Sequence, residues 1–226
     1  GVKQVILNYS SGSAWTQVNM TLSDGLYKAS IPAFPFDTSV EYRVFASDNN
    51  GNVANPSSLY SYKVIDLYLP LLRIDRPEHG SYLSGTVAIT VFMKDQNSGG
   101  ESGFASAELS INGTVVKTWE TPAPSEPDTY SWNTATFGAD GTYIIKLKVR
   151  DKAGNIAEKS LTVTVDNTQP TAVINEPAAG SYLRLSVLIK ATGSDTNFDK
   201  MEVRIDDQLV RTSFTSGTEA LQWKTR

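Results

Sequence analysis

The sequence repeats itself at a spacing of 100 residues, and this repeat constrains the fold more than any other feature. The segment 66–91 aligns without a gap with the segment 166–191. The matching positions are Asp66/Asp166, Pro70/Pro170, Ile74/Ile174, Pro77/Pro177, Gly80–Leu83/Gly180–Leu183, Val87/Val187 and Ile89/Ile189. A gapless match of this density predicts two copies of one structural unit of about 100 residues.

A second relation links the front of the chain to its middle. The run 40–48 aligns with the run 143–151, and both lead into a turn of the pattern D-x-x-G-N-x-A. The unit is therefore seen three times. The predicted domains are 1–66, which lacks the first strands of the unit, 67–166, which is complete, and 167–226, which is truncated at its C-terminal end.

This arrangement predicts a segment of a longer tandem array. The alternative is that neighbouring chains complete the two partial copies, as in filaments built by donor strands. We favour the array, because the partial copies overlap in content rather than complement each other.

The hydrophobic pattern within each copy has a period of two residues. In the segment 143–150, apolar side chains at every second position alternate with Ile144, Lys146, Lys148 and Arg150. Such alternation is typical of antiparallel strands with one buried face, and Asn112-Gly113 and Asp140-Gly141 are hairpin turn signals. No stretch of ten residues has helical spacing. The sequence therefore predicts an all-β fold of tandem Ig-like antiparallel β-sandwiches with a repeat of about 100 residues.

The junctions between copies are short. Three residues separate Asp66 from Pro70, and three separate Asp166 from Pro170. Proline fixes its own φ and favours extended backbone at the residue before it, so these linkers are stiffer than Gly/Ser tethers. We therefore expect the sandwiches to be arranged end to end, over on the order of 100 Å for three copies.

Composition excludes several classes of function. The formal net charge is −4, which argues against a nucleic-acid partner because phosphate binding needs a basic surface. With no cysteine and one histidine, the chain has neither a thiol nucleophile nor a site built on two histidines. The longest apolar runs are four or five residues, too short for membrane insertion by this segment.

These residues resemble the bacterial and archaeal Ig-like repeats of secreted and cell-surface proteins. The resemblance rests on the opener P-x-x-x-I-x-x-P-x-x-G-S-Y-L, the D-N-T-x-P junction at 166–170 and the D-x-x-G-N-x-A turn. The more divergent segment 5–32 looks like a fibronectin-III-like partner of such domains. The resemblance implies an extracellular or cell-surface location and a role as a stalk, adhesin repeat, surface-layer unit, filament repeat or spacer beside a catalytic domain.

Acidic residues at turns and junctions are weak candidates for Ca²⁺ ligands, namely Asp48, Asp66, Asp151 and Asp166. The favoured interpretation of the D-x-x-G-N turn is structural, with the Asp capping backbone N–H groups and Gly154 at positive φ. No cofactor beyond this Ca²⁺ is expected. The expected structural junction and turn residues are Asp66, Pro70, Asp166, Pro170, Gly154 and Asn155.

Tryptophans are the best candidates for ligand contact. Trp132 and Trp223 occupy equivalent strand positions and are expected in the core. Trp15 and Trp119 lie near loops, where an exposed ring stacks on sugars or peptides, although packing is the more common role.

The sequence predicts no catalytic residues and no enzyme, since no acid, base and nucleophile set stands out in any copy. The expected function is a non-catalytic extracellular structural segment that spaces or displays other domains. Its partners would be neighbouring domains of a longer parent chain and other copies in a surface assembly. The alternative is a carbohydrate- or peptide-binding accessory module of a secreted hydrolase.

Overall fold

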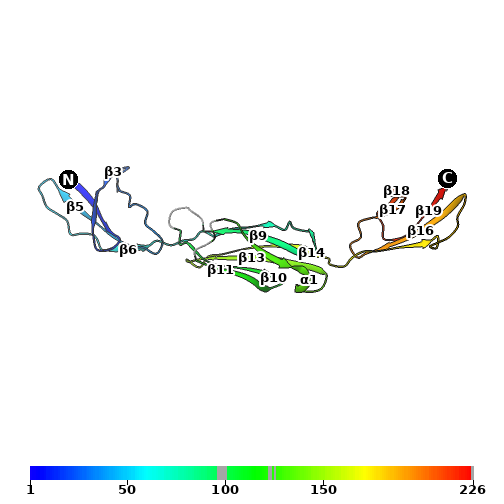
Figure 1. The fold of residues 1–226 in the computed structure, drawn as a ribbon. Coiled ribbons are helices and arrows are strands. Elements are labelled where there is room, and N and C mark those ends of the chain that lie inside the picture. Colours follow the sequence, from blue (N-terminus) through cyan, green and yellow to red (C-terminus); the bar gives the residue numbers. More distant parts are fainter. Residues whose placement is uncertain (96–100, 122–123, 125, 225–226) are drawn as a thin grey trace. The chain divides into compact units, whose positions relative to one another are not determined.

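The computed structural model describes the chain except residues 96–100, 122–123, 125 and 225–226. By backbone proximity the chain forms two compact units. One comprises residues 1–79, 88–131 and 144–162, and the other comprises 80–87, 132–143 and 163–226. Nearly all regular structure is β-strand (Figure 1).

The N-terminal strands form one four-stranded antiparallel sheet in the order β2-β1-β5-β6. Its strands are β1 (Val2–Ser10), β2 (Thr16–Asn19), β5 (Ser39–Asp48) and β6 (Tyr60–Lys63), and a separate hairpin joins β3 (Thr21–Ser23) to β4 (Leu26–Lys28). Alternation along β1 buries one face of the sheet, where Val5, Leu7 and Tyr9 are less than 9% exposed.

The middle strands form two sheets, in the orders β11-β10-β13-β14-β8 and β12-β9-β7. The first holds β8 (Tyr82–Leu83), β10 (Phe104–Ile111), β11 (Thr114–Glu120), β13 (Gly141–Asp151) and β14 (Ile156–Val165). The second holds β7 (Leu71–Arg76), β9 (Thr86–Lys94) and β12 (Asp128–Asn133), and a single helical turn, α1 (Thr134–Phe137), follows β12.

The middle core follows the alternation in the sequence. Ile145, Leu147 and Val149 on β13 are fully buried, and so are Ile89 and Val91 on β9. The alternating segment 143–150 is a strand as predicted, and β13 extends two residues before it and one residue after it. Two elements were not predicted, β8 and α1, because a strand of two residues and a helix of four show no measurable periodicity.

The C-terminal strands form a three-stranded sheet, β15-β16-β19, and a two-stranded sheet, β17-β18. Their bounds are β15 (Thr171–Glu176), β16 (Ser186–Ser194), β17 (Met201–Ile205), β18 (Gln208–Ser213) and β19 (Gly217–Lys224). Val187, Ile189, Ala191, Met201 and Val203 form a buried cluster, against which Trp223 packs.

The three strand sets share one plan. The pairings β2-β1-β5-β6 repeat the order β11-β10-β13-β14 of the middle set. Similarly, β15-β16-β19 repeats β7-β9-β12, and the hairpin β17-β18 repeats β10-β11. The fold prediction, an all-β chain of repeated antiparallel Ig-like sheets, is confirmed. The predicted domain boundaries at 66/67 and 166/167 stay predictions.

Replacement of Leu147 by Ala is expected to lower the free energy of unfolding by about 2–5 kcal/mol, because it leaves a cavity in a packed core. Ile144, three residues before Leu147, points to the other face of β13 and is 50% exposed, so Ile144→Ala is the matched control, with a change within about 0.5 kcal/mol. Urea denaturation followed by tryptophan fluorescence measures both. Equal losses in the two variants would contradict the assigned core face.

Candidate metal centre

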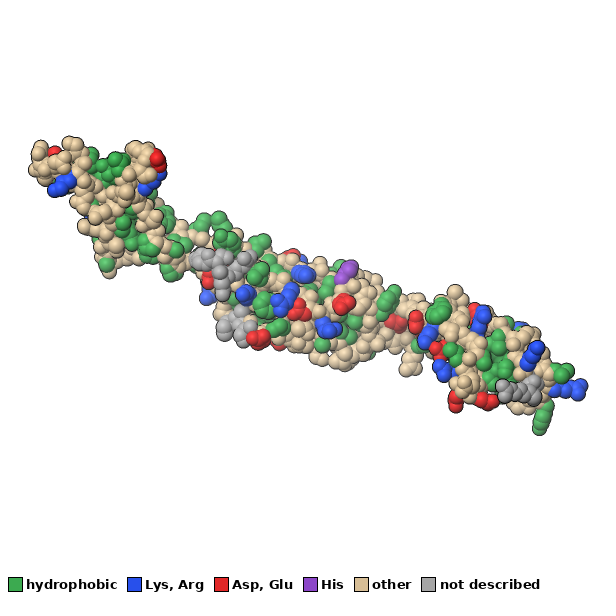
Figure 2. Space-filling model, turned by 90° about the horizontal axis from the view of Figure 1, so that it is seen from above, with side chains coloured by type: hydrophobic (Ala, Val, Ile, Leu, Met, Phe, Trp, Pro, Cys, Tyr) green, Lys and Arg blue, Asp and Glu red, His purple; other side chains and the backbone are tan. Residues whose placement is uncertain are grey.

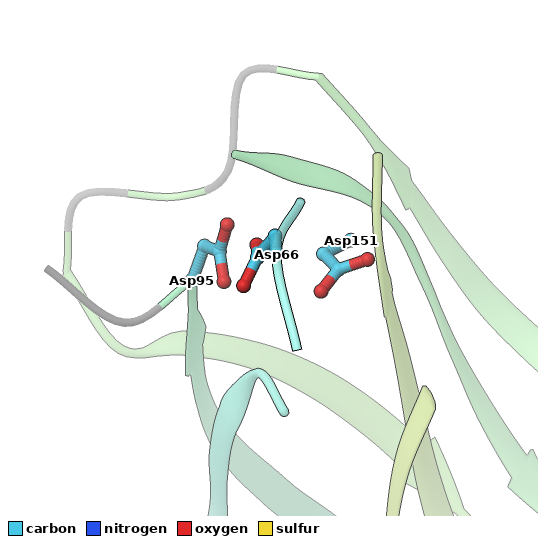
Figure 3. A group of neighbouring side chains, drawn as sticks. All are labelled: Asp66, Asp95 and Asp151. Atoms are coloured by element: carbon cyan, nitrogen blue, oxygen red, sulfur yellow. The ribbon is translucent and has the colours of Figure 1, made fainter. Parts of the chain in front are cut away.

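Three buried carboxylates converge at one end of the middle sheets (Figure 3). Asp66 lies in the segment after β6, Asp95 directly after β9, and Asp151 at the end of β13. One carboxylate oxygen of each lies within 4.8 Å of the others. The three residues are 4%, 7% and 1% exposed, respectively, and in Figure 3 Asp66 stands between the other two.

Hydrogen bonds to backbone amides hold Asp66 in place. Its Oδ1 accepts from the N–H of Tyr68 at 3.0 Å, and its Oδ2 accepts from the N–H of Ser102 at 2.8 Å. Burial alone would raise the pKa of Asp66, but the hydrogen bonds from Ser102 and Tyr68 together outweigh it, so the pKa lies below its ordinary value. Asp66 is therefore held in its charged form.

The D-x-x-G-N turn positions Asp151. Both of its carboxylate oxygens accept from Asn155, one from the backbone N–H and one from the side-chain amide, each at 2.8 Å. The same side-chain amide donates to the backbone carbonyl of Asp66 at 3.1 Å. Gly154 has a φ of 97°, which favours glycine in this turn. Asn155 thus ties the turn to the segment that carries Asp66.

Asp95 is the member of the group that the sequence analysis missed. One of its oxygens accepts a hydrogen bond from the N–H of Gly103. A signal for it was present, because Asp95 aligns with Asp195 at the spacing of the repeat. What the sequence lacked was the approach of β9 and β13 at one end of the fold, which brings Asp95 beside Asp151.

Three clustered carboxylates suit a hard cation. Ca²⁺ takes six to eight oxygen ligands at about 2.3–2.6 Å, with carboxylates among the preferred ones. Each carboxylate oxygen here can accept beyond its present hydrogen bond, because it carries two lone pairs. Burial at such short separations makes mutual repulsion costly without a counter-charge. The donor set, all oxygen and formally −3, fits Ca²⁺ and offers no soft ligand.

The other two Ca²⁺ candidates stand apart from this group. Asp48 accepts from the backbone N–H groups of Asn50 and Asn52 and from the side chain of Asn52, as expected for a structural turn. The hydrogen bond from the Asn52 side chain is the main cause of a lowered pKa at Asp48. Asp166 accepts from Thr168 and from the side chain of Asn197. Within the described residues, neither belongs to a group of three possible metal ligands.

The second junction is bound to the loop before β13. The carboxylate of Asp140 accepts from the N–H of Asn167 at 2.8 Å and from the N–H of Thr168 at 3.1 Å, and also from the Thr168 hydroxyl. These bonds, led by that from the hydroxyl, lower the pKa of Asp140. The side chain of Asn167 accepts from the N–H of Gly85 and from the hydroxyl of Thr134.

The two junction prolines differ in burial. Pro70 is buried, whereas Pro170 is exposed. Each follows a capped Asp by four residues, since Asp66 accepts from Tyr68 and Asp166 from Thr168, both at 3.0 Å. The same short cap therefore precedes both prolines.

The two tryptophans that are candidates for ligand contact, Trp119 on β11 and Trp15 before β2, have different environments. Trp119 is 8% exposed, and its indole N–H donates to Asp128 at 2.7 Å. Lys117 donates to the same carboxylate oxygen at 2.7 Å and lies over the Trp119 ring at 5.0 Å from its centroid. Trp119 is therefore a packing residue without a free ring face, whereas Trp15 is 39% exposed.

The remaining tryptophans are in the core as expected. Trp132 is 1% exposed and makes edge-to-face contacts with Phe137 and Tyr143, at centroid distances of 6.0 and 5.5 Å. Trp223 packs against the buried cluster of the C-terminal strands.

Comparison with protein families finds one match, in the middle of the chain. Residues 88–167 match the family of bacterial Ig-like domains. The resemblance drawn from the G-S-Y-L opener and the D-x-x-G-N turn is thereby confirmed. No protein among the curated sequences matches the chain.

Solved structures show only a distant likeness to the chain. Fibronectin(III)-like modules of Clostridium thermocellum CbhA are 15% identical, with 72% of this chain and 78% of that chain covered and a TM-score of 0.35. A tetra-tandem repeat from the extending region of a large adhesion protein is 15% identical over 96% of this chain and 57% of that one, with a TM-score of 0.37. A Ca²⁺-stabilised, ice-binding adhesin of an Antarctic bacterium is 15% identical over 98% and 57%, with a TM-score of 0.33.

Proposed function

We propose that this chain is a non-catalytic structural segment of an extracellular or cell-surface protein, and that it spaces or displays other domains. The proposal rests on three repeated strand sets and on the match of residues 88–167 to the family of bacterial Ig-like domains. The observation that carries it is the anchoring of the segments that join these sets.

Both joining segments are hydrogen-bonded to residues of the middle strand set. Asp66 accepts from Ser102, and its carbonyl accepts from Asn155. At the other junction, Asp140 holds Asn167 and Thr168. Only residues 67–70 separate Asp66 from β7, and only 169–170 separate Thr168 from β15. Such short segments favour a stiff spacer over a flexible tether.

The proposed role requires no reaction chemistry. The one histidine, His79, accepts a hydrogen bond from the N–H of Thr162 through Nδ1. In the part of the chain that the structure describes, the group of three clustered carboxylates includes no histidine and no cysteine. Their burial and backbone hydrogen bonds suit a structural cation better than proton transfer.

The proposed partners are neighbouring domains of a longer parent chain and other copies of the chain in a surface assembly, such as an adhesin, surface layer or filament. Acidic and basic side chains are interspersed on the face drawn in Figure 2, without the basic stripe that nucleic acids require. In the described part of the chain, no helix has the length and apolar character to cross a membrane. Removal of the segment by protease from intact cells tests the proposed location, and full protection would refute it.

We also propose that Asp66, Asp95 and Asp151 bind a structural Ca²⁺. The ion would link the segment after β6 to the ends of β9 and β13, and so add a further anchor at the first junction. A ligand that binds only the folded state stabilises it by RT ln(1 + [L]/Kd), about 2.7 kcal/mol at one hundred times Kd.

Calcium is expected to raise the melting temperature of the chain by at least about 5 °C at 1 mM, relative to EDTA. Asp95→Asn keeps a side-chain oxygen for Gly103 but removes one charge, so its melting temperature should change little with Ca²⁺. The effect should also weaken at acidic pH, because Ca²⁺ binds deprotonated carboxylates and protons compete with it. Differential scanning calorimetry measures these shifts.

Asp75→Asn is the matched control for this experiment. Asp75 forms an ion pair with Arg73 at 2.8 Å, at an exposed position of β7, and lies outside the carboxylate group. This variant should therefore respond to Ca²⁺ like the unmodified chain. An equal calcium response in the Asp95→Asn variant would exclude the assigned site.

Asp140→Ala is expected to loosen residues 167–170, because it removes the acceptor for Asn167 and Thr168. The backbone order parameter of this segment should fall from about 0.85 to below about 0.6, as measured by ¹⁵N relaxation on the full chain. Asp199→Ala, at an exposed position of the loop before β17, should leave the segment unchanged. Unchanged order in the Asp140→Ala variant would show that these bonds do not stiffen the junction.

A further inference from the structure

The face of the N-terminal sheet opposite its core carries an unusual row of side chains. Because strands alternate, Gln4, Ile6 and Asn8 on β1 point away from the face that buries Val5 and Leu7. The register places these residues beside partners on β5, in the pairs Gln4/Ser47, Ile6/Phe45 and Asn8/Arg43. On the other side of β1, Asn8 faces Gln17 of β2.

A groove runs along this row and is uncharged. Its lining residues are Gln4, Ile6, Gln17, Phe45, Ser47 and Val53. Ile6, Phe45 and Val53 supply apolar surface, while the two glutamines and the serine supply side-chain donors and acceptors. The lining therefore combines an apolar floor with polar groups that are not charged.

Aromatic rings continue the row beyond the groove. The Arg43 guanidinium lies over both Trp15 and Phe45, at 4.9 and 5.1 Å from the ring centroids. This stacking fixes the two rings on one face of the sheet. Trp15 is 39% exposed, so it presents ring surface to solvent.

Two polar atoms beside the groove lack hydrogen-bond partners among the described residues. They are Oδ1 of Asn8, a residue only 5% exposed, and Nε of Arg43. Buried polar groups are normally hydrogen-bonded, so an unpaired acceptor and an unpaired donor on adjacent residues point to a missing polar group. A hydroxyl both donates and accepts, and so it satisfies one of each.

We propose that this face binds a neutral oligosaccharide. Sugar rings offer C–H faces for Phe45 and Trp15 and hydroxyls for the glutamine amides. Arg43 is a cation beside the groove, but the unpaired Oδ1 of the neighbouring Asn8 needs a donor, which a hydroxyl supplies and an anion does not. A peptide added as an extra strand would need free backbone groups, but the backbone groups of β1 are used in pairing with β2 and β5. This binding site is independent of the proposed spacer function.

Titration calorimetry of the full chain tests the proposal with soluble neutral hexasaccharides of glucose, xylose, mannose and N-acetylglucosamine, each up to about 5 mM. At least one should bind. Phe45→Ala and Trp15→Ala should each weaken that binding about tenfold, the loss expected from one aromatic contact. Gln17→Ala should also weaken it, without changing the melting temperature by more than about 2 °C.

Tyr60→Ala is the matched control, because Tyr60 is an exposed aromatic residue whose register places it on the opposite face of the same sheet. It should bind like the unmodified chain. Absence of binding to all four neutral hexasaccharides would overturn the proposal, as would tighter binding of hexagalacturonate. Capture on immobilised casein that depends on Phe45 would assign the face to a polypeptide instead.

Discussion

The buried carboxylate of Asp66 is the contact on which the arrangement at the first junction depends. Asp66 follows the last strand of the N-terminal set. Its two carboxylate oxygens accept hydrogen bonds from Tyr68, in the segment that leads to β7, and from Ser102, in the loop before β10. A buried charge is tolerated only when it is hydrogen-bonded, so these donors fix where the chain after β6 must run. Asp95 and Asp151 then approach it because β9 and β13 end at the same place, and the cluster is a product of the fold rather than of any local motif.

The second junction achieves a similar result with different chemistry. There Asp140, from the turn before β13, takes the donors of Asn167 and Thr168, while the Asn167 side chain accepts from Gly85 and Thr134. At the first junction three carboxylates lie close together, whereas at the second a single carboxylate accepts hydrogen bonds from neutral donors. Only at the first junction do we therefore propose a divalent cation.

Much of the fold was predictable, because period-two alternation and hairpin turns are local properties. Leu147 and Ile144, three residues apart on β13, illustrate this, since they fall on opposite faces as the alternation predicts. The candidate metal centre was only half predictable. Asp66 and Asp151 were candidates, but Asp95 joins them through contacts between segments that are distant in sequence. Trp15 and Trp119 were indistinguishable in sequence. Asp128 on β12 becomes a hydrogen-bond partner of Trp119 and Lys117 on β11 only when the two strands have folded.

The alternation along β1 has a consequence for how the N-terminal set can diversify. Val5, Leu7 and Tyr9 secure the core, while Gln4 and Ile6 line the groove. Substitutions of Gln4 and Ile6 can therefore alter the proposed recognition with little effect on the core. A deletion or insertion of one residue, by contrast, exchanges the two sets at once. Evolution along this strand is expected to proceed by exchange of residues at constant length, so that specificity varies while the scaffold is inherited intact.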